Sequence, residues 1–146
     1  MNIQKFLTGD QQQQIIAAIR MAETNTSGEI RLHISKTSNG NDPMVEALNI
    51  FNQLEMYKTG QRNGVLFYIS VADRKFAIIG DQGINEIVPP DFWEDIKNMV
   101  ILHFRQQNYV QGLTEGIKMA GMKLKEHFPY QKDDVNELSD DISFQE

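Results

Sequence analysis

The chain has 146 residues, of which 40% are hydrophobic and 23% are charged. This length and balance suit one globular domain with a buried core. There is no cysteine, which excludes disulfides, thiolate metal sites and cysteine nucleophiles. No apolar run reaches the roughly 20 residues of a membrane helix, and the first residues lack the apolar stretch of a secretory signal. We therefore expect a cytoplasmic protein with no membrane segment.

The net charge of -6 is concentrated near the C-terminus. Six acidic residues and one basic residue lie within positions 132–146, so the rest of the chain is nearly neutral. No basic stripe of the kind that nucleic acids attract is present, which excludes nucleic acid as an expected partner. We divide the chain into a domain over residues 1–129 and an acidic, disordered tail over residues 130–146, to which a protein partner could bind.

The first part of the chain predicts a helix followed by a strand. The helix begins near Thr8 or Asp10, either of which can cap it, and Ile15 and Ile19 fall on its apolar face. Residues 29–34 alternate strictly between apolar and polar side chains. Such alternation predicts a strand with one wetter face, here near the edge of a sheet, and His33 then lies on the surface.

A second helix and a central strand come next. Asp42 can cap the free amides of the helix and Pro43 suits its first position. Residues 65–71 are almost continuously apolar, as in a strand that is covered on both faces. Asp73 and Arg74 are assigned to a turn, after which residues 75–80 return as the second strand of a hairpin.

The remaining elements are a loop over residues 81–91, which contains two prolines, and two further helices. Their apolar positions run from Phe92 to Phe104 and from Val110 to Phe128. Strand, helix, parallel strand and hairpin together predict a mixed sheet between helical layers, an α/β fold with about four helices. We expect a monomer.

Three connections of this topology meet at one edge of the sheet, namely the edge that is formed by the ends of the strands. They cover residues 26–29, 59–63 and 81–91, which are rich in acids, amides and glycines. The sequence contains no phosphate-binding loop that ends in Gly-Lys-Ser/Thr and no serine in a Gly-x-Ser-x-Gly turn. What remains is chemistry carried by oxygen ligands, and this edge is the candidate site.

Five side chains at this edge could together bind a hard cation such as Mg²⁺ or Ca²⁺: Glu29, Asn63, Asp81, Glu86 and Asp91. Arg62 could then face a bound phosphate with its planar fork. A metal ion would polarise a phosphoryl oxygen and make a bound water more acidic, so that hydrolysis needs no protein nucleophile. The alternative is that these carboxylates are solvated loop residues, with Asp91 complementing the dipole of the following helix.

Three segments in this order resemble the signature segments of the TPM domain family. They are residues 26–31 (Thr-Ser-Gly-Glu-Ile-Arg), residues 62–66 (Arg-Asn-Gly-Val-Leu) and residues 73–81 (Asp-Arg-Lys-Phe-Ala-Ile-Ile-Gly-Asp). The resemblance extends over about residues 3–128. It implies a three-layer α/β/α sandwich, in agreement with the elements above. Two positions depart from the family pattern: Asn63 stands where many relatives have aspartate, and residues 81–86 replace a commoner glycine-rich loop.

The resemblance also implies a function. Members of the family include thylakoid lumen proteins of photosystem repair, some are credited with phosphatase activity, and several bind divalent metals through loop carboxylates. The implied function is hydrolysis of phosphoric monoesters through a metal-activated water, with a small phosphate ester as the substrate. Asp81 and Arg62 would then be the catalytic residues, and Arg62 would stabilise the charge on the transferred phosphoryl group. The alternative function is a non-catalytic, metal-stabilised module for protein binding or assembly.

Overall fold

The computed structural model describes residues 2–131 and 136–146. The helices that follow the short 3₁₀ turn at Ile3–Lys5 are α1 (Gly9–Glu23), α2 (Pro43–Gln53), α3 (Gln82–Asn85), α4 (Glu94–Arg105) and α5 (Tyr109–His127). The strands are β1 (Glu29–Ser35), β2 (Gly64–Ser70), β3 (Lys75–Gly80) and β4 (Ser143–Gln145). The part of the predicted tail at residues 132–135 lies outside the described residues.

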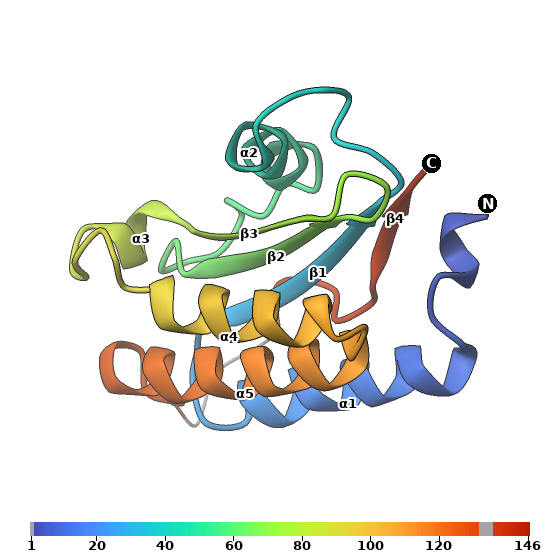
Figure 1. The fold of residues 1–146 in the computed structure, drawn as a ribbon. Coiled ribbons are helices and arrows are strands. Elements are labelled where there is room, and N and C mark those ends of the chain that lie inside the picture. The colour runs from blue at the N-terminus through green and yellow to red at the C-terminus, as the bar shows by residue number, and fades with distance from the viewer. Residues whose placement is uncertain (1, 132–135) are drawn as a thin grey trace.

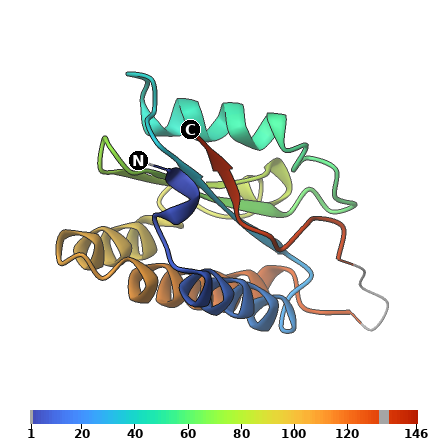
Figure 2. The same cartoon turned by 90° about the vertical axis from the view of Figure 1, so that its right-hand side faces the viewer.

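The strands form one mixed sheet in the order β3-β2-β1-β4. β1 and β2 are parallel and are connected through α2, whereas β2 and β3 form an antiparallel hairpin. Helix α2 covers one face of the sheet, and α1, α4 and α5 cover the other (Figures 1 and 2). The predicted three-layer α/β/α sandwich is confirmed. None of the helices in the described residues has the length and apolarity needed to cross a membrane.

The two faces of the sheet carry separate clusters of buried side chains. Ile30, Leu32 and Ile34 of β1 join the larger cluster, which α1, α4 and α5 complete. Leu66 and Tyr68 of β2 belong to the smaller cluster beneath α2. All seven residues of β2 are buried, so this strand is the central one that its apolar run predicts.

The predicted starts of the first two helices are confirmed. The Thr8 hydroxyl accepts a hydrogen bond from the Gln11 backbone, and the Gln11 side chain accepts one from the Thr8 backbone, which is a capping box. Asp42 accepts a hydrogen bond from the Met44 backbone at 2.8 Å, and Pro43 is the first residue of α2. Both helices therefore begin where side chains replace the missing intrahelical acceptors.

The C-terminal residues differ from the prediction of a disordered tail. β4 lies parallel to β1, with Ser143 opposite His33. As a result β1 is an internal strand instead of lying near an edge, and His33 is buried instead of lying on the surface. The two ring nitrogens of His33 lie 2.7 Å from the Ser143 hydroxyl and 2.9 Å from the Ser35 hydroxyl. Burial lowers the pKa of His33 to about 4.

The predicted loop over residues 81–91 also contains a short helix, α3. It packs against the loop before β2, and the Gly83 amide donates a hydrogen bond to the Arg62 carbonyl at 2.9 Å. A Cβ atom at Gly83 would overlap the Gln61 carbonyl oxygen and lie 2.7 Å from that of Arg62. Only glycine allows the two loops to approach this closely.

Gly83→Ala should therefore destabilise the protein by about 2 kcal/mol, the cost of forcing a methyl group into filled space. The matched control is Gly9→Ala, because a Cβ atom at Gly9 has no neighbour within 4 Å. Urea unfolding of both variants would measure the difference. Equal stability of the two variants would show that the loops can separate at little cost.

Candidate functional site

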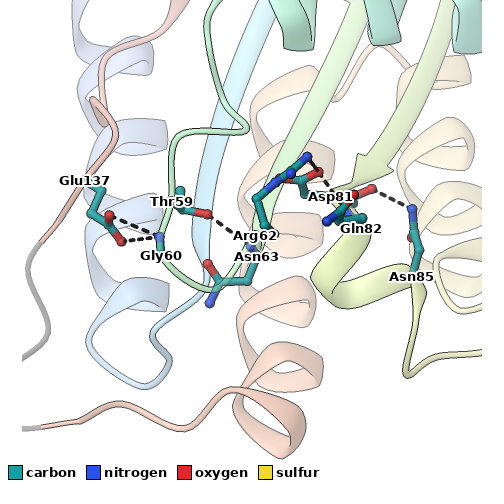
Figure 3. A network of polar contacts seen from close by, with 9 residues as sticks. Thr59, Gly60, Arg62, Asn63, Asp81, Gln82, Asn85 and Glu137 are labelled. Carbon is teal, nitrogen blue, oxygen red and sulfur yellow. Dashed lines mark hydrogen bonds and ion pairs between the residues drawn. The ribbon is translucent and has the colours of Figure 1, made fainter.

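The sheet register brings the three predicted connections to one edge. Glu29 at the start of β1 is opposite Gly64 at the start of β2, and Val65 is opposite Gly80 at the end of β3. The loop before β2 and the segment after β3 lie side by side at this edge (Figure 3). Asn63 is hydrogen-bonded through its backbone carbonyl to the Glu29 amide at 3.3 Å, which joins the first connection to the second.

An ion pair between Arg62 and Asp81 connects the two loops shown in Figure 3. Arg62 Nε donates to Asp81 Oδ2 at 2.7 Å, and Nη2 donates to Oδ1 at 2.9 Å. Asp81 Oδ1 also accepts the Gln82 amide at 2.8 Å and so caps α3. The Asp81 side chain is 6% exposed and that of Arg62 is 38% exposed. The hydrogen bonds to Asp81 raise the pKa of Arg62, so the guanidinium stays charged.

Amides and hydroxyls hold the loop before β2 in place. The side-chain amides of Gln61 and Asn63 donate through Nε2 and Nδ2 to the Ser27 hydroxyl at 3.1 and 3.4 Å. The backbone N–H of Asn63 donates to Thr59 Oγ1 at 3.2 Å. On the other side of the loop, the Gly60 amide donates to the Glu137 carboxylate at 3.2 Å (Figure 3). The C-terminal segment therefore contributes directly to the edge.

Glu29 lies at this edge but turns toward the C-terminal segment. Its Oε1 atom accepts the Leu138 amide at 2.6 Å. Burial is the main reason why the pKa of Glu29 is raised to about 7. Glu29 also lines a cavity of about 400 Å³ together with Glu23 and Asp140.

Glu23 and Asp140 form a pair of carboxyl groups that the sequence did not indicate. The pKa of Glu23 is raised to about 9, mainly by burial and to a smaller extent by the hydrogen bond to Asp140. Glu23 Oε2 accepts the Ile30 amide at 3.0 Å. Asp140 Oδ1 is buried and has no donor among the described residues, and a protonated Glu23 is the kind of group that can donate a hydrogen bond to it. At neutral pH the pair therefore holds a proton between α1 and the C-terminal segment.

The five predicted metal ligands are not gathered around one point. Asp81 is bound to Arg62, Asn63 to Ser27, and Glu29 to the C-terminal segment. Glu86 and Asp91 are exposed. Within residues 2–131 and 136–146, no group of three or more His, Asp or Glu side chains could hold a metal ion.

The chemical nature of these side chains suits a divalent cation, but their arrangement in the structure does not. Carboxylate and amide oxygens are the ligands that Mg²⁺ and Ca²⁺ prefer, so the chemistry of the set fits. The arrangement does not fit, because the side chains are not gathered around one point and the Arg62 guanidinium takes both oxygens of the Asp81 carboxylate. Arg62 thus occupies the place of a cation beside Asp81.

The profile of the TPM domain matches residues 2–123. The chain belongs to the TPM domain family. It is 48% identical to the BA42 protein from the psychrophilic bacterium Bizionia argentinensis, whose NMR structure matches with a TM-score of 0.90 over 98% of both chains. A search of curated proteins gave no match.

Two more distant solution structures show the same fold. The N-terminal domain of a P. gingivalis protein is 20% identical, with a TM-score of 0.65 over 86% of this chain and 82% of that one. The N-terminal domain of the cg2496 protein from Corynebacterium glutamicum is 11% identical, with a TM-score of 0.64 over 94% and 80%. At these identities the likeness concerns the architecture of the TPM domain alone.

The raised pKa of Glu23 predicts how the stability of the protein depends on pH. A carboxyl group whose pKa is raised on folding contributes stability that is present below its unfolded pKa and is lost as the pH rises through its folded pKa. For Glu23 this window runs from the ordinary value of 4.5 to about 9. Glu23→Gln keeps a neutral donor and acceptor, so it should become more stable than the wild type by at least about 1 kcal/mol at pH 9.

Urea unfolding at pH 5, 7 and 9 would measure this effect, with Glu126→Gln on the exposed side of α5 as the control. The advantage of Glu23→Gln should grow with pH, whereas that of the control should not. A constant difference between Glu23→Gln and wild type across this range would mean that Glu23 does not hold its proton in the folded state.

Proposed function

We propose that this TPM domain is a divalent-metal-dependent hydrolase of small phosphoric monoesters, and that the sheet edge around Arg62 and Asp81 is its active site. The observation that carries the proposal is the two-pronged ion pair at an open edge. Asp81 is almost fully buried while more than a third of the Arg62 side chain remains exposed. A phosphate could therefore reach the guanidinium from the solvent.

Arg62 has the geometry to bind the phosphoryl group. Its planar fork matches two phosphate oxygens, and Nη1 has no hydrogen-bond partner in the described residues. In this role Arg62 would stabilise the negative charge that builds up on the phosphoryl oxygens. When bound, Mg²⁺ or Ca²⁺ supplies a second positive charge and a more acidic water.

Asp81 is the first ligand that we propose for the cation, with Glu29, Asn63, Glu86 and Asp91 as candidates to complete the set. Arg62 and the cation compete for the same carboxylate. Release of Arg62 from Asp81 would therefore both open the cation site and free the guanidinium for the substrate. Glu86 adds to the negative potential around Arg62, so a carboxylate near the pair remains available.

The direct test is hydrolysis of p-nitrophenyl phosphate by the purified chain after chelation, and again after Mg²⁺, Ca²⁺ or Mn²⁺ is restored. We expect activity to disappear with the chelator and to return with at least one metal. A rate that is unchanged by chelation would contradict the role of the cation. No turnover with any metal would contradict the hydrolase itself.

Competition for Asp81 gives a sharper prediction for Arg62→Gln. Removing the guanidinium frees the carboxylate, so the affinity for the cation should rise, by about tenfold, since cation sites tighten with the charge of their ligands. Activity should fall by about a hundredfold, the usual loss when a donor to the developing charge is removed. Calorimetric titration and the phosphatase assay would measure the two effects separately.

Asp81→Asn should lower both the cation affinity and the activity, and Lys118→Gln, an exposed change on α5, should alter neither. Thermal unfolding of each variant would show whether it is folded. If Arg62→Gln weakened the cation as much as Asp81→Asn does, then Arg62 would support the site instead of competing for it.

One feature favours the alternative of a protein-binding module. Met21 on α1 and Met122 on α5 are 70% and 64% exposed, and both line a largely apolar groove between these helices. Exposed methionines of this kind are common at adaptable binding surfaces. Cation binding without any turnover would favour this function over the hydrolase.

A further inference from the structure

A second cavity lies at the opposite end of the sheet from Arg62 and Asp81. It has a volume of about 590 Å³, within the range of small-molecule sites. Its walls come from the turn between β2 and β3, where Ser70 is opposite Lys75, and from the connection between α4 and α5. No part of the proposed hydrolase site contributes to it.

The charge of this cavity is positive although the chain as a whole carries a net charge of -6. Four cationic side chains line it and no acidic one does: Arg74, Lys75, Lys97 and Arg105. In the described parts of the chain, none of these four side chains forms an ion pair. Four unpaired cations around one cavity repel each other and attract an anion.

The nearest acidic residue in the turn is already occupied. Asp73 Oδ2 accepts the Ser38 amide and hydroxyl at 2.6 and 2.7 Å, and the Ser70 hydroxyl at 2.8 Å. These hydrogen bonds lower the pKa of Asp73 to about 2. Asp73 therefore fixes the turn; its attraction to Lys75 is only the weakest of the effects that lower its pKa, and it forms no ion pair with Arg74 or Lys75 in the described residues.

The rest of the cavity wall is mainly apolar and includes several aromatic rings. The ring of Phe104 lies 5.5 Å from that of Phe76 and 5.3 Å from that of Tyr109, measured between centroids. Phe6 and Ile101 extend this wall. A ligand that fills the cavity therefore needs an apolar body as well as a negative charge.

The start of α5 adds a further attraction for negative charge. Tyr109 lines the cavity and is the first residue of this 19-residue helix, whose N-cap, Asn108, makes no side-chain capping bond. Free amides and the helix dipole at such a terminus favour an anion. This effect supports the four side chains and would not be sufficient alone.

We propose that this cavity binds a small amphipathic anion. A carboxylate or phosphate head would lie among Arg74, Lys75, Lys97 and Arg105, and an aliphatic or aromatic body would pack against Phe76, Phe104 and Tyr109. The site is separate from the proposed hydrolase edge, and either could exist without the other.

The probe for this site is decanoate, at concentrations below those at which it forms micelles, added to the full chain. Amide shifts of Val71, Phe76, Ile101 and Phe104 should titrate to saturation in NMR spectra. Acetate, which has only the head, and decyltrimethylammonium, which reverses the charge, should bind much more weakly. Such a result would show that binding needs both the positive charge and the apolar wall of the cavity.

Two double variants with the same change in charge locate the site. Lys97→Gln/Arg105→Gln should weaken decanoate binding by about tenfold, because it removes two charge-assisted contacts. Lys118→Gln/Lys125→Gln, at the rim of the groove between α1 and α5, should change the affinity less than about twofold. Both pairs include exposed side chains, and thermal unfolding would confirm that the variants are folded.

Three outcomes would overturn the proposal. The first is equal weakening by the two double variants, and the second is a set of shifts confined to α1 and the C-terminal half of α5. The third is failure of decanoate to bind while the protein sediments with anionic phospholipid vesicles. In that case the cations would form a membrane-binding patch and not a site for a small anion.

Discussion

Complete burial of β2 is the constraint on which both ends of this molecule depend. A strand that is covered on both faces needs a neighbour on each side to satisfy its backbone, and here β1 pairs with it in parallel and β3 antiparallel. The start of β1, the start of β2 and the end of β3 must then share one edge. The turn between β2 and β3 must lie at the other edge, together with the end of α4. The two candidate sites are thus placed by the topology of a single buried strand.

The edge around Arg62 shows how strongly local contacts can shape a polar site. Asp81 serves as an ion-pair partner and as a helix cap at once, while Gly83 brings α3 against the Arg62 carbonyl. Breaking one side of a buried ion pair leaves a charge that neither water nor protein compensates. The pair is therefore a stable resting arrangement, and any ligand at Asp81 must offer more than the guanidinium does.

The sequence predicted the elements that local patterns determine. Local sequence was sufficient to predict the helix starts at Thr8 and Asp42 and the buried strand β2, which has a continuous apolar run. The convergence of the three loops followed from the topology. The contacts within the edge did not follow, because the spacing of Glu29, Asp81 and Glu86 says nothing about which partner each carboxylate chooses. In the structure Arg62 and Asp81 are partners of each other, a contact that composition alone does not assign.

The C-terminal segment was the larger difference, and its cause is physical. Ser143, Phe144 and Gln145 are too few to show a strand period, and the acidic residues before them are typical of a disordered tail. What orders the segment is a set of long-range contacts: β4 pairs with β1, Glu29 accepts the Leu138 amide, and the side chain of Glu23 is hydrogen-bonded to that of Asp140. Burial disfavours the charged forms of Glu23 and Glu29, and hydrogen bonds from the Ile30 and Leu138 amides offset part of that cost. These contacts exist only in the complete fold. The C-terminal segment therefore belongs to the candidate edge and cannot be treated as a separable appendage.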